Sequence, residues 1–98
     1  MLDLSLKDFK SFSANLEGRY GLVKHQSYIK TFTSGHKVGI NNFIDCPNEW
    51  LLYLETPEDE VGSLGTYDSV KEALEAFTEI FNNNLIREPL IRGFKEWR

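Results

Sequence analysis

The segment from Ser69 to Asn84 is the part of this sequence that most constrains its fold. Apolar residues recur there at helical spacing, and a run of asparagines ends the pattern. Ser69 and Glu72 have the spacing of a capping box, which predicts where the helix begins. The apolar residues are Val70, Ala73, Leu74, Phe77, Ile80 and Phe81. A helix with one apolar face needs an apolar surface to pack on, and the rest of the chain must supply it.

The middle of the chain has the composition of β-strands. Residues 28–33 are rich in β-branched and aromatic side chains, and Ser34-Gly35-His36 is typical of a tight turn. Residues 38–44 are expected to return as the partner strand, with a bulge or a second turn at Asn41-Asn42. Residues 50–55 are apolar on both faces, which predicts a central strand covered by a helix on at least one side.

Both ends of the chain are predicted to be helical. Ser5 and Asp8 are spaced as a capping box, and Gly18 is placed to end a helix. The apolar residues between them at helical spacing are Phe9, Phe12 and Leu16. We therefore expect an N-terminal helix over about Ser5–Glu17. Pro89 suits the first turn of a last, short helix.

These elements predict one α+β domain spanning residues 1–98, with residues 56–65 as a polar loop. The expected architecture is an N-terminal helix, a three- to four-stranded antiparallel sheet, a helix packed on one face and a short C-terminal helical tail. The single cysteine, Cys46, excludes an internal disulfide framework. No apolar run approaches the roughly 18 residues that a membrane span needs. Charges interrupt the N-terminal apolar residues, unlike a signal peptide, so we expect a cytoplasmic protein.

The sequence contains no strong catalytic or metal-binding motif. It lacks the glycine-rich dinucleotide and phosphate-binding motifs and the paired histidines of zinc proteases. His25 and His36 are interpreted as surface histidines beside turns, and Cys46 as a small buried thiol with no third group to orient a catalytic pair. The acidic run Glu58-Asp59-Glu60 lacks the alternation of a calcium loop. We therefore predict a protein that is not an enzyme and has no catalytic residue, metal or cofactor.

Charge is distributed unevenly along the chain, although the net charge is only −4. Residues 1–44 carry six bases and three acids, and residues 87–98 carry four bases and two acids. Residues 45–86 carry ten acids and a single base, Lys71. The ten acids are Asp45, Glu49, Glu55, Glu58, Asp59, Glu60, Asp68, Glu72, Glu75 and Glu79. Charge of one sign concentrated in loops and on a helix face creates a directional electric field.

We expect these acids, together with Tyr67, to form a binding surface for a basic protein. Tyrosine and tryptophan often anchor protein interfaces, and complementary charge speeds the encounter. In size, charge and layout the chain is similar to small immunity proteins that neutralise the nuclease toxins of contact-dependent growth inhibition systems or bacteriocins. It is similar to phage-encoded inhibitors such as anti-CRISPR proteins in the same respects. In the competing interpretation, the basic flanks neutralise the acidic segment within the fold.

Two other kinds of partner are compatible with the sequence. Basic and aromatic residues are interleaved in the N-terminal part of the predicted β region, a pattern typical of surfaces that bind single-stranded nucleic acid. Those residues are Lys24, Tyr28, Lys30, Phe32 and Lys37. The apolar residues of the C-terminal tail could instead join two copies of the chain, or close the core of their own chain. The tail residues are Leu90, Ile91, Phe94 and Trp97.

Overall fold

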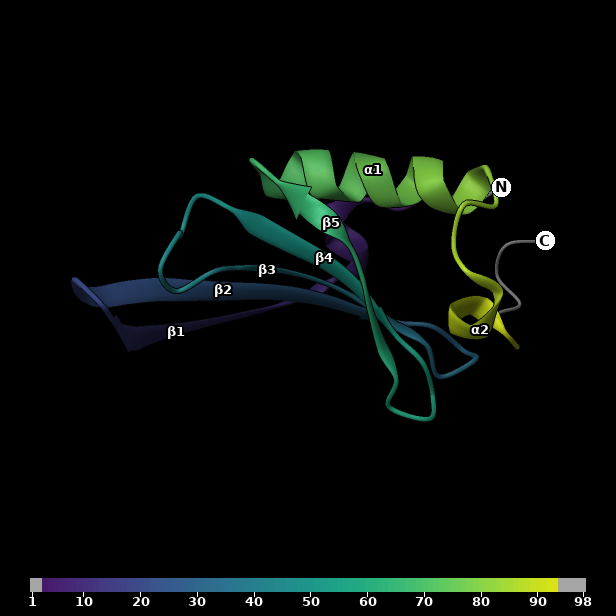
Figure 1. Cartoon of the computed structure of the whole chain (residues 1–98), viewed down its shortest axis with the longest axis horizontal. Helices are drawn as coiled ribbons and strands as arrows, with labels where there is room; N and C mark the ends of the chain where they lie inside the picture. The colour runs from purple at the N-terminus through teal and green to yellow at the C-terminus, as the bar shows by residue number, and fades with distance from the viewer. Residues whose placement is uncertain (1–2, 94–98) are drawn as a thin grey trace.

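A five-stranded antiparallel sheet dominates the structure (Figure 1), a computed structural model that describes residues 3–93 except for the side chain of Glu88. The strands lie in the sheet in their chain order, so each one pairs with its neighbours in sequence. They are β1 (Lys10–Gly18), β2 (Gly21–Thr31), β3 (Lys37–Asn42), β4 (Trp50–Glu55) and β5 (Val61–Tyr67). The helical segments in this range are the 3-10 turn η1 (Leu6–Asp8), α1 (Val70–Asn82) and α2 (Glu88–Ile91).

The prediction of an N-terminal helix over Ser5–Glu17 is wrong. The chain forms only η1 there, where the Asp8 carboxylate accepts a hydrogen bond from the Ser5 N–H at 2.9 Å, and then enters β1. Phe12 and Leu16 are four residues apart, a spacing that puts both on one face of either a helix or a strand. The positions between the apolar residues are mostly serine and asparagine, which form helices poorly. The continuous pairing with β2 therefore stabilises residues 10–18 as a strand rather than as a helix.

The predicted number of three to four strands is too low, because the sheet has five strands and includes β1 and β5. Residues 61–65, the second half of the segment predicted as a loop, belong instead to β5, whereas residues 56–60 form the turn before it. Gly62 shows why a strand tolerates a glycine there: a Cβ atom at this position would overlap the side chain of Leu90 in α2. The central strand is β3 rather than β4, and Asn41-Asn42 continue the β3 ladder instead of forming a bulge or turn.

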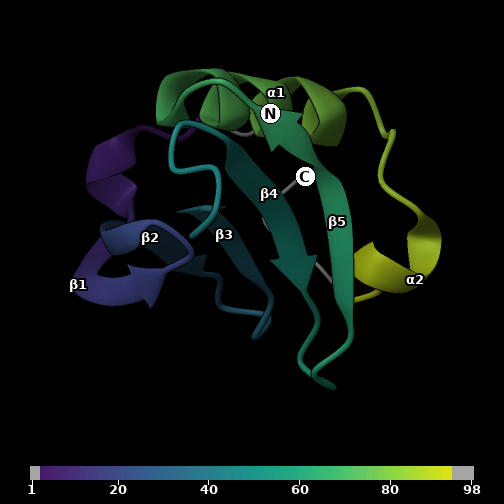
Figure 2. The same ribbon diagram turned by 60° about the vertical axis from the view of Figure 1, so that its left-hand side comes forward.

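The core lies between α1 and one face of the sheet, which we call the covered face (Figures 1 and 2). The helix predicted after Ser69 is confirmed. Its cap is formed by the Ser69 hydroxyl, which accepts a hydrogen bond from the Glu72 N–H at 3.1 Å. The side chains that this packing buries almost completely are Val38, Ile40, Leu52, Leu54, Ala73, Phe77 and Phe81.

The other side of the sheet, which we call the open face, is turned away from α1. Directly paired residues in an antiparallel ladder share a face. Ile40 and Leu52 point into the core, so their neighbours Gly39 and Tyr53 belong to the open face. The large side chains that the register places there are partly or largely exposed. They are Phe12, Leu16, Ile29, Leu51, Tyr53 and Val61.

β1 and β2 extend past the end of β3 as a hairpin arm, residues 13–26 (Figure 1, left). The buried side chain of Asn42 holds the base of this arm. Its Oδ1 accepts a hydrogen bond from the Gln26 N–H at 2.9 Å, and its Nδ2 donates to the Lys24 carbonyl at 3.0 Å. The side-chain amide thus continues the backbone ladder beyond the last residue of β3. The projecting arm accounts for the long dimension of the molecule, 44 Å against 25 and 23 Å.

Candidate protein-binding surface

The fold distributes the ten predicted acids over several parts of the molecule. Glu58, Asp59 and Glu60 lie exposed in the β4–β5 turn, whereas Asp45 and Glu49 lie exposed in the β3–β4 loop. These two loops are at opposite ends of β4, so the six-residue strand separates them by roughly 20 Å. The acidic segment is therefore not one continuous surface.

Four of the acids do come together, on and just before α1. Glu72, Glu75 and Glu79 are exposed, and at about 100° per residue they fall within roughly 60° of arc around the helix axis; Asp68, also exposed, lies just before the helix. The Glu72 carboxylate also accepts a hydrogen bond from the Asp68 N–H at 3.2 Å. We call these four residues the acidic stripe. Glu49 and Asp68 follow the last pair of the β4–β5 ladder, Trp50 and Tyr67, on their two strands.

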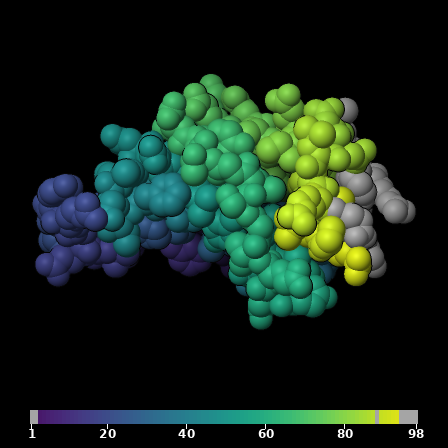
Figure 3. Space-filling model, in the orientation of Figure 1, coloured from purple at the N-terminus to yellow at the C-terminus, as the bar shows by residue number. Residues whose placement is uncertain are grey.

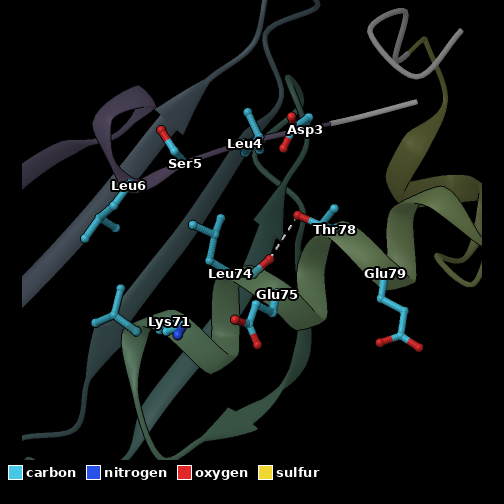
Figure 4. A pocket seen from close by; sticks show the side chains of 10 residues that line it. Asp3, Leu4, Ser5, Leu6, Lys71, Leu74, Glu75, Thr78 and Glu79 are labelled. Carbon is cyan, nitrogen blue, oxygen red and sulfur yellow. Dashed lines mark hydrogen bonds between the residues drawn. The ribbon is translucent and has the colours of Figure 1, made fainter.

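A groove of about 620 Å³ runs beside the acidic stripe, between the N-terminal segment and α1 (Figure 4). Its apolar lining comes from Leu4 and Leu6 on one side and from Val70 and Leu74 of α1 on the other. The Thr78 hydroxyl donates to the Leu74 carbonyl at 3.1 Å, so its hydrogen-bonding need is met within the helix. The charged residues that line this groove are Asp3, Lys71, Glu75 and Glu79.

Within the part of the chain that the structure describes, the acidic stripe forms no ion pair. The ion pair that the structure does show joins Lys37 to Glu55 at 3.8 Å, across the β3–β4 ladder on the open face. Glu55 is thus the one acid of the predicted site with a basic partner in residues 3–93. Like charges at helical spacing repel one another, so the stripe is a cost to the helix.

Tyr67 does not contribute a free interface side chain. It packs partly buried against the core beside Trp50, and its hydroxyl donates to the Leu64 carbonyl at 3.0 Å. Tyr53 lies on the open face, away from the groove. Burial, followed by the negative charge of Glu55, raises the pKa of the Tyr53 phenol above its ordinary value of 10.0.

Two expectations about nucleophilic side chains need correction. His36 is buried rather than on the surface, and its Nδ1 lies 2.8 Å from the Ser34 hydroxyl. Cys46 is exposed in the β3–β4 loop rather than buried at a strand end. Among residues 3–93, no three His, Cys, Asp or Glu side chains are grouped closely enough to hold a metal ion.

The residues of the other two partner hypotheses are largely engaged within the fold. Phe32 is only 5% exposed, and the ring of Tyr28 packs against that of Trp50 with centroids 6.2 Å apart. Neither ring is therefore free to stack on a base. In the tail, Leu90 and Ile91 pack against the core of their own chain. The two other tail residues of that hypothesis, Phe94 and Trp97, lie outside the described residues.

The groove itself was not predicted from the sequence. Val70 and Leu74 belong to the apolar set of α1, and nothing in that set marks which members stay uncovered. Leu6 lies in the segment that was predicted to begin an N-terminal helix, which does not form. Knowing that the N-terminal segment runs beside α1 requires the fold (Figure 4).

No helix in residues 3–93 is long and apolar enough to cross a membrane. A search of protein-family models, curated proteins and solved structures found no match to this chain.

Proposed function

We propose that this protein binds a basic protein partner through the groove and the acidic stripe, and that it acts as an inhibitor of that partner. The observation that carries the proposal is the juxtaposition of an apolar groove with acids that have no basic partner among the described residues. A monomer gains nothing in stability from exposing Leu6 or from grouping like charges. A partner that carries apolar side chains flanked by lysine or arginine would satisfy both features.

The two parts of the surface serve different steps of binding. Exposed acids attract a basic protein over a distance and increase the association rate, an effect that salt screens. Apolar contacts in the groove then bury surface from water and slow dissociation. Leu74 lies between the two, because it lines the groove and precedes Glu75 directly in α1.

A nuclease is the class of partner that we favour. Enzymes that bind phosphate backbones carry basic grooves, and an acidic protein that occupies such a groove competes with the nucleic acid. The protein would then work in the cytoplasm as an immunity protein against a nuclease toxin. The second candidate is a phage-encoded inhibitor of the anti-CRISPR kind, which would use the same complementarity against a different nucleic-acid-binding channel.

The direct test uses nuclease toxin domains encoded next to this gene or elsewhere in the same genome, each purified and titrated with the full chain. We expect one of them to bind with submicromolar affinity and to lose nuclease activity at one equivalent. Binding should weaken as NaCl rises from 50 to 500 mM. Leu74→Ala and Glu75→Lys should each weaken it by about tenfold, mainly through dissociation for the first and association for the second.

Glu58→Lys is the matched control, because it makes the same charge change in the β4–β5 turn, on the opposite side of the molecule from α1 (Figures 1 and 2). It should change affinity by less than about twofold. If Glu58→Lys weakens binding as much as Glu75→Lys, net charge rather than the groove is responsible and the proposed surface is wrong. Inhibition of an RNA-guided nuclease instead of a toxin would select the second candidate.

A further inference from the structure

The two edges of the sheet are protected very differently. The β5 edge has a register shift opposite Leu52/Tyr53, and Leu90 of α2 packs onto its Gly62. Irregular pairing and a covering element are the usual ways in which proteins block an edge strand from pairing with another chain. β1, the other edge, has neither: its pairing with β2 continues without a shift from Lys10 to Gly18.

The exposure of β1 is equally unusual. Every residue from Lys10 to Glu17 is exposed, and the strand contains no proline. Two large apolar residues lie on its open face, Phe12 at 55% and Leu16 at 37% exposed. Its outer backbone N–H and C=O groups have no strand beside them among the described residues. Such an edge is a template for a further strand.

We propose that β1 pairs antiparallel with β1 of a second copy of this chain, forming a two-fold symmetric dimer with one continuous ten-stranded sheet. The two-fold axis passes between the Ala14 residues of the two copies. This register places Phe12 of each copy opposite Leu16 of the other, on the shared open face, and Ala14 opposite itself. On the reverse face it places Ser11 opposite Glu17 and Ser13 opposite Asn15.

A two-fold axis normal to the sheet favours the antiparallel orientation, because it keeps the open faces of both copies on one side, where Phe12 and Leu16 meet. In this register Lys10 lies opposite Gly18, whereas parallel in-register pairing would oppose Lys10 to Lys10 and Glu17 to Glu17. An isologous two-fold contact of this kind also closes after two copies, so it does not lead to fibres. β1 contributes no residue to the groove beside α1, so this proposal and the proposed function stand or fall separately.

Disulfide trapping tests the register directly. Residues opposed across an antiparallel ladder have Cα atoms about 4.5–5.5 Å apart, within the range of a disulfide. In a Cys46→Ser background, which removes the exposed native thiol, Ala14→Cys should form a covalent dimer with oxidised glutathione at least tenfold faster than Leu22→Cys. Leu22 is a matched control because it is 78% exposed on the same arm but lies on β2. A mixture of Phe12→Cys and Leu16→Cys chains should crosslink faster than either variant alone.

Sedimentation equilibrium of the unmodified chain gives the second readout. The dimer fraction should rise with concentration over the micromolar range, and Ala14→Lys should weaken dimerisation at least tenfold by opposing two lysines at the axis. Leu22→Lys should leave it unchanged, and circular dichroism should show the same fold for both variants. A chain that stays monomeric up to 500 µM, or equal crosslinking of Ala14→Cys and Leu22→Cys, would overturn the proposal. A dimer whose Ala14→Cys variant fails to crosslink would overturn it too, because the contact would then lie elsewhere.

Discussion

The ring of Tyr53 in β4 lies directly over Gly39 in β3, so that a Cβ atom at position 39 would overlap it. The two residues are paired across the ladder on the open face. Gly39 is buried, although no helix of residues 3–93 covers this side, because the tyrosine ring takes the place of its missing side chain. This contact protects the central strand from water on the open face.

The first prediction concerns the change in stability when Gly39 is replaced. Gly39→Ala should destabilise the protein by about 1–3 kcal/mol, because the Tyr53 ring must move off the strand. In a Tyr53→Ala background the same change should be neutral or stabilising by about 0.5–1 kcal/mol, since alanine is otherwise favoured over glycine inside a strand. Urea denaturation of the four proteins of this double-mutant cycle measures both values. Equal destabilisation in the two backgrounds would show that the ring is not the obstacle.

The second prediction concerns pH. The pKa of Tyr53 is raised above 10.0 in the folded protein, first by burial and then by Glu55. The stability that depends on its neutral form is therefore fully present below pH 10.0 and is lost as pH rises through the folded-state pKa. Tyr53→Phe should flatten the fall in the free energy of unfolding above pH 10.0, whereas Tyr20→Phe, at an 89% exposed position, should not. Absorbance titration at 295 nm should show a tyrosine that ionises above pH 10.0 and is lost in Tyr53→Phe, and Glu55→Gln should bring the pKa of Tyr53 closer to 10.0.

The third prediction concerns the anchor of the hairpin arm. Asn42→Ala should cost about 1–3 kcal/mol, because it leaves the Gln26 N–H and the Lys24 carbonyl without their partner. Amide hydrogen exchange at Gln26 should accelerate more than at core positions of β3. Asn41→Ala changes the neighbouring residue, whose amide hydrogen-bonds only locally, and should cost less than about 1 kcal/mol. If both variants have the same exchange pattern, Asn42 does not hold the arm.

The fourth prediction separates stability from binding on the acidic stripe. Glu79 lies in the last turn of α1, where a negative charge opposes the helix dipole, and that turn contains no base. Glu79→Lys should therefore stabilise the protein by about 0.3–1 kcal/mol while weakening partner binding. Glu72→Lys, in the first turn, should weaken binding but destabilise the fold, because Glu72 favours the dipole and accepts from the Asp68 N–H.

Thermal unfolding at 20 mM and 1 M NaCl checks this pair of variants. Both changes in stability should shrink in high salt, because screening weakens the charge–dipole interaction. An identical sign for the two variants at low salt would contradict the dipole argument.

How far the sequence predicts this fold depends on whether a signal is local. α1 was predicted because its cap and its apolar periodicity lie within one short segment, as does the turn at Ser34-Gly35-His36 that joins β2 to β3. β1 was missed because Phe12 and Leu16 fit a helix and a strand equally well. Only the pairing of residues 10–18 with 21–29 distinguishes the two, and that pairing is not visible from one segment.

β5 was missed because its glycines imitate a loop. Gly62 makes room for Leu90, almost thirty residues further along the chain, so its purpose is a tertiary contact. The same difference between local sequence signals and tertiary contacts applies to the candidate site. The sequence predicted acids on a helix face, and Glu72, Glu75 and Glu79 share one side of α1 because of their helical spacing. The separation of Glu58-Asp59-Glu60 from them, and the groove beside Leu74, follow from how the strands are connected.

The chain-order pairing of the strands also determines how the molecule can assemble. Each strand meets its partner across a short connection, so little loop entropy opposes the formation of each successive hairpin. The apolar residues of β3 and β4, however, have nothing to bury them until α1 follows at the end of the sheet. On a ribosome the sheet would therefore be ready before its core, and folding would become cooperative only when Phe77 and Phe81 have left the exit tunnel.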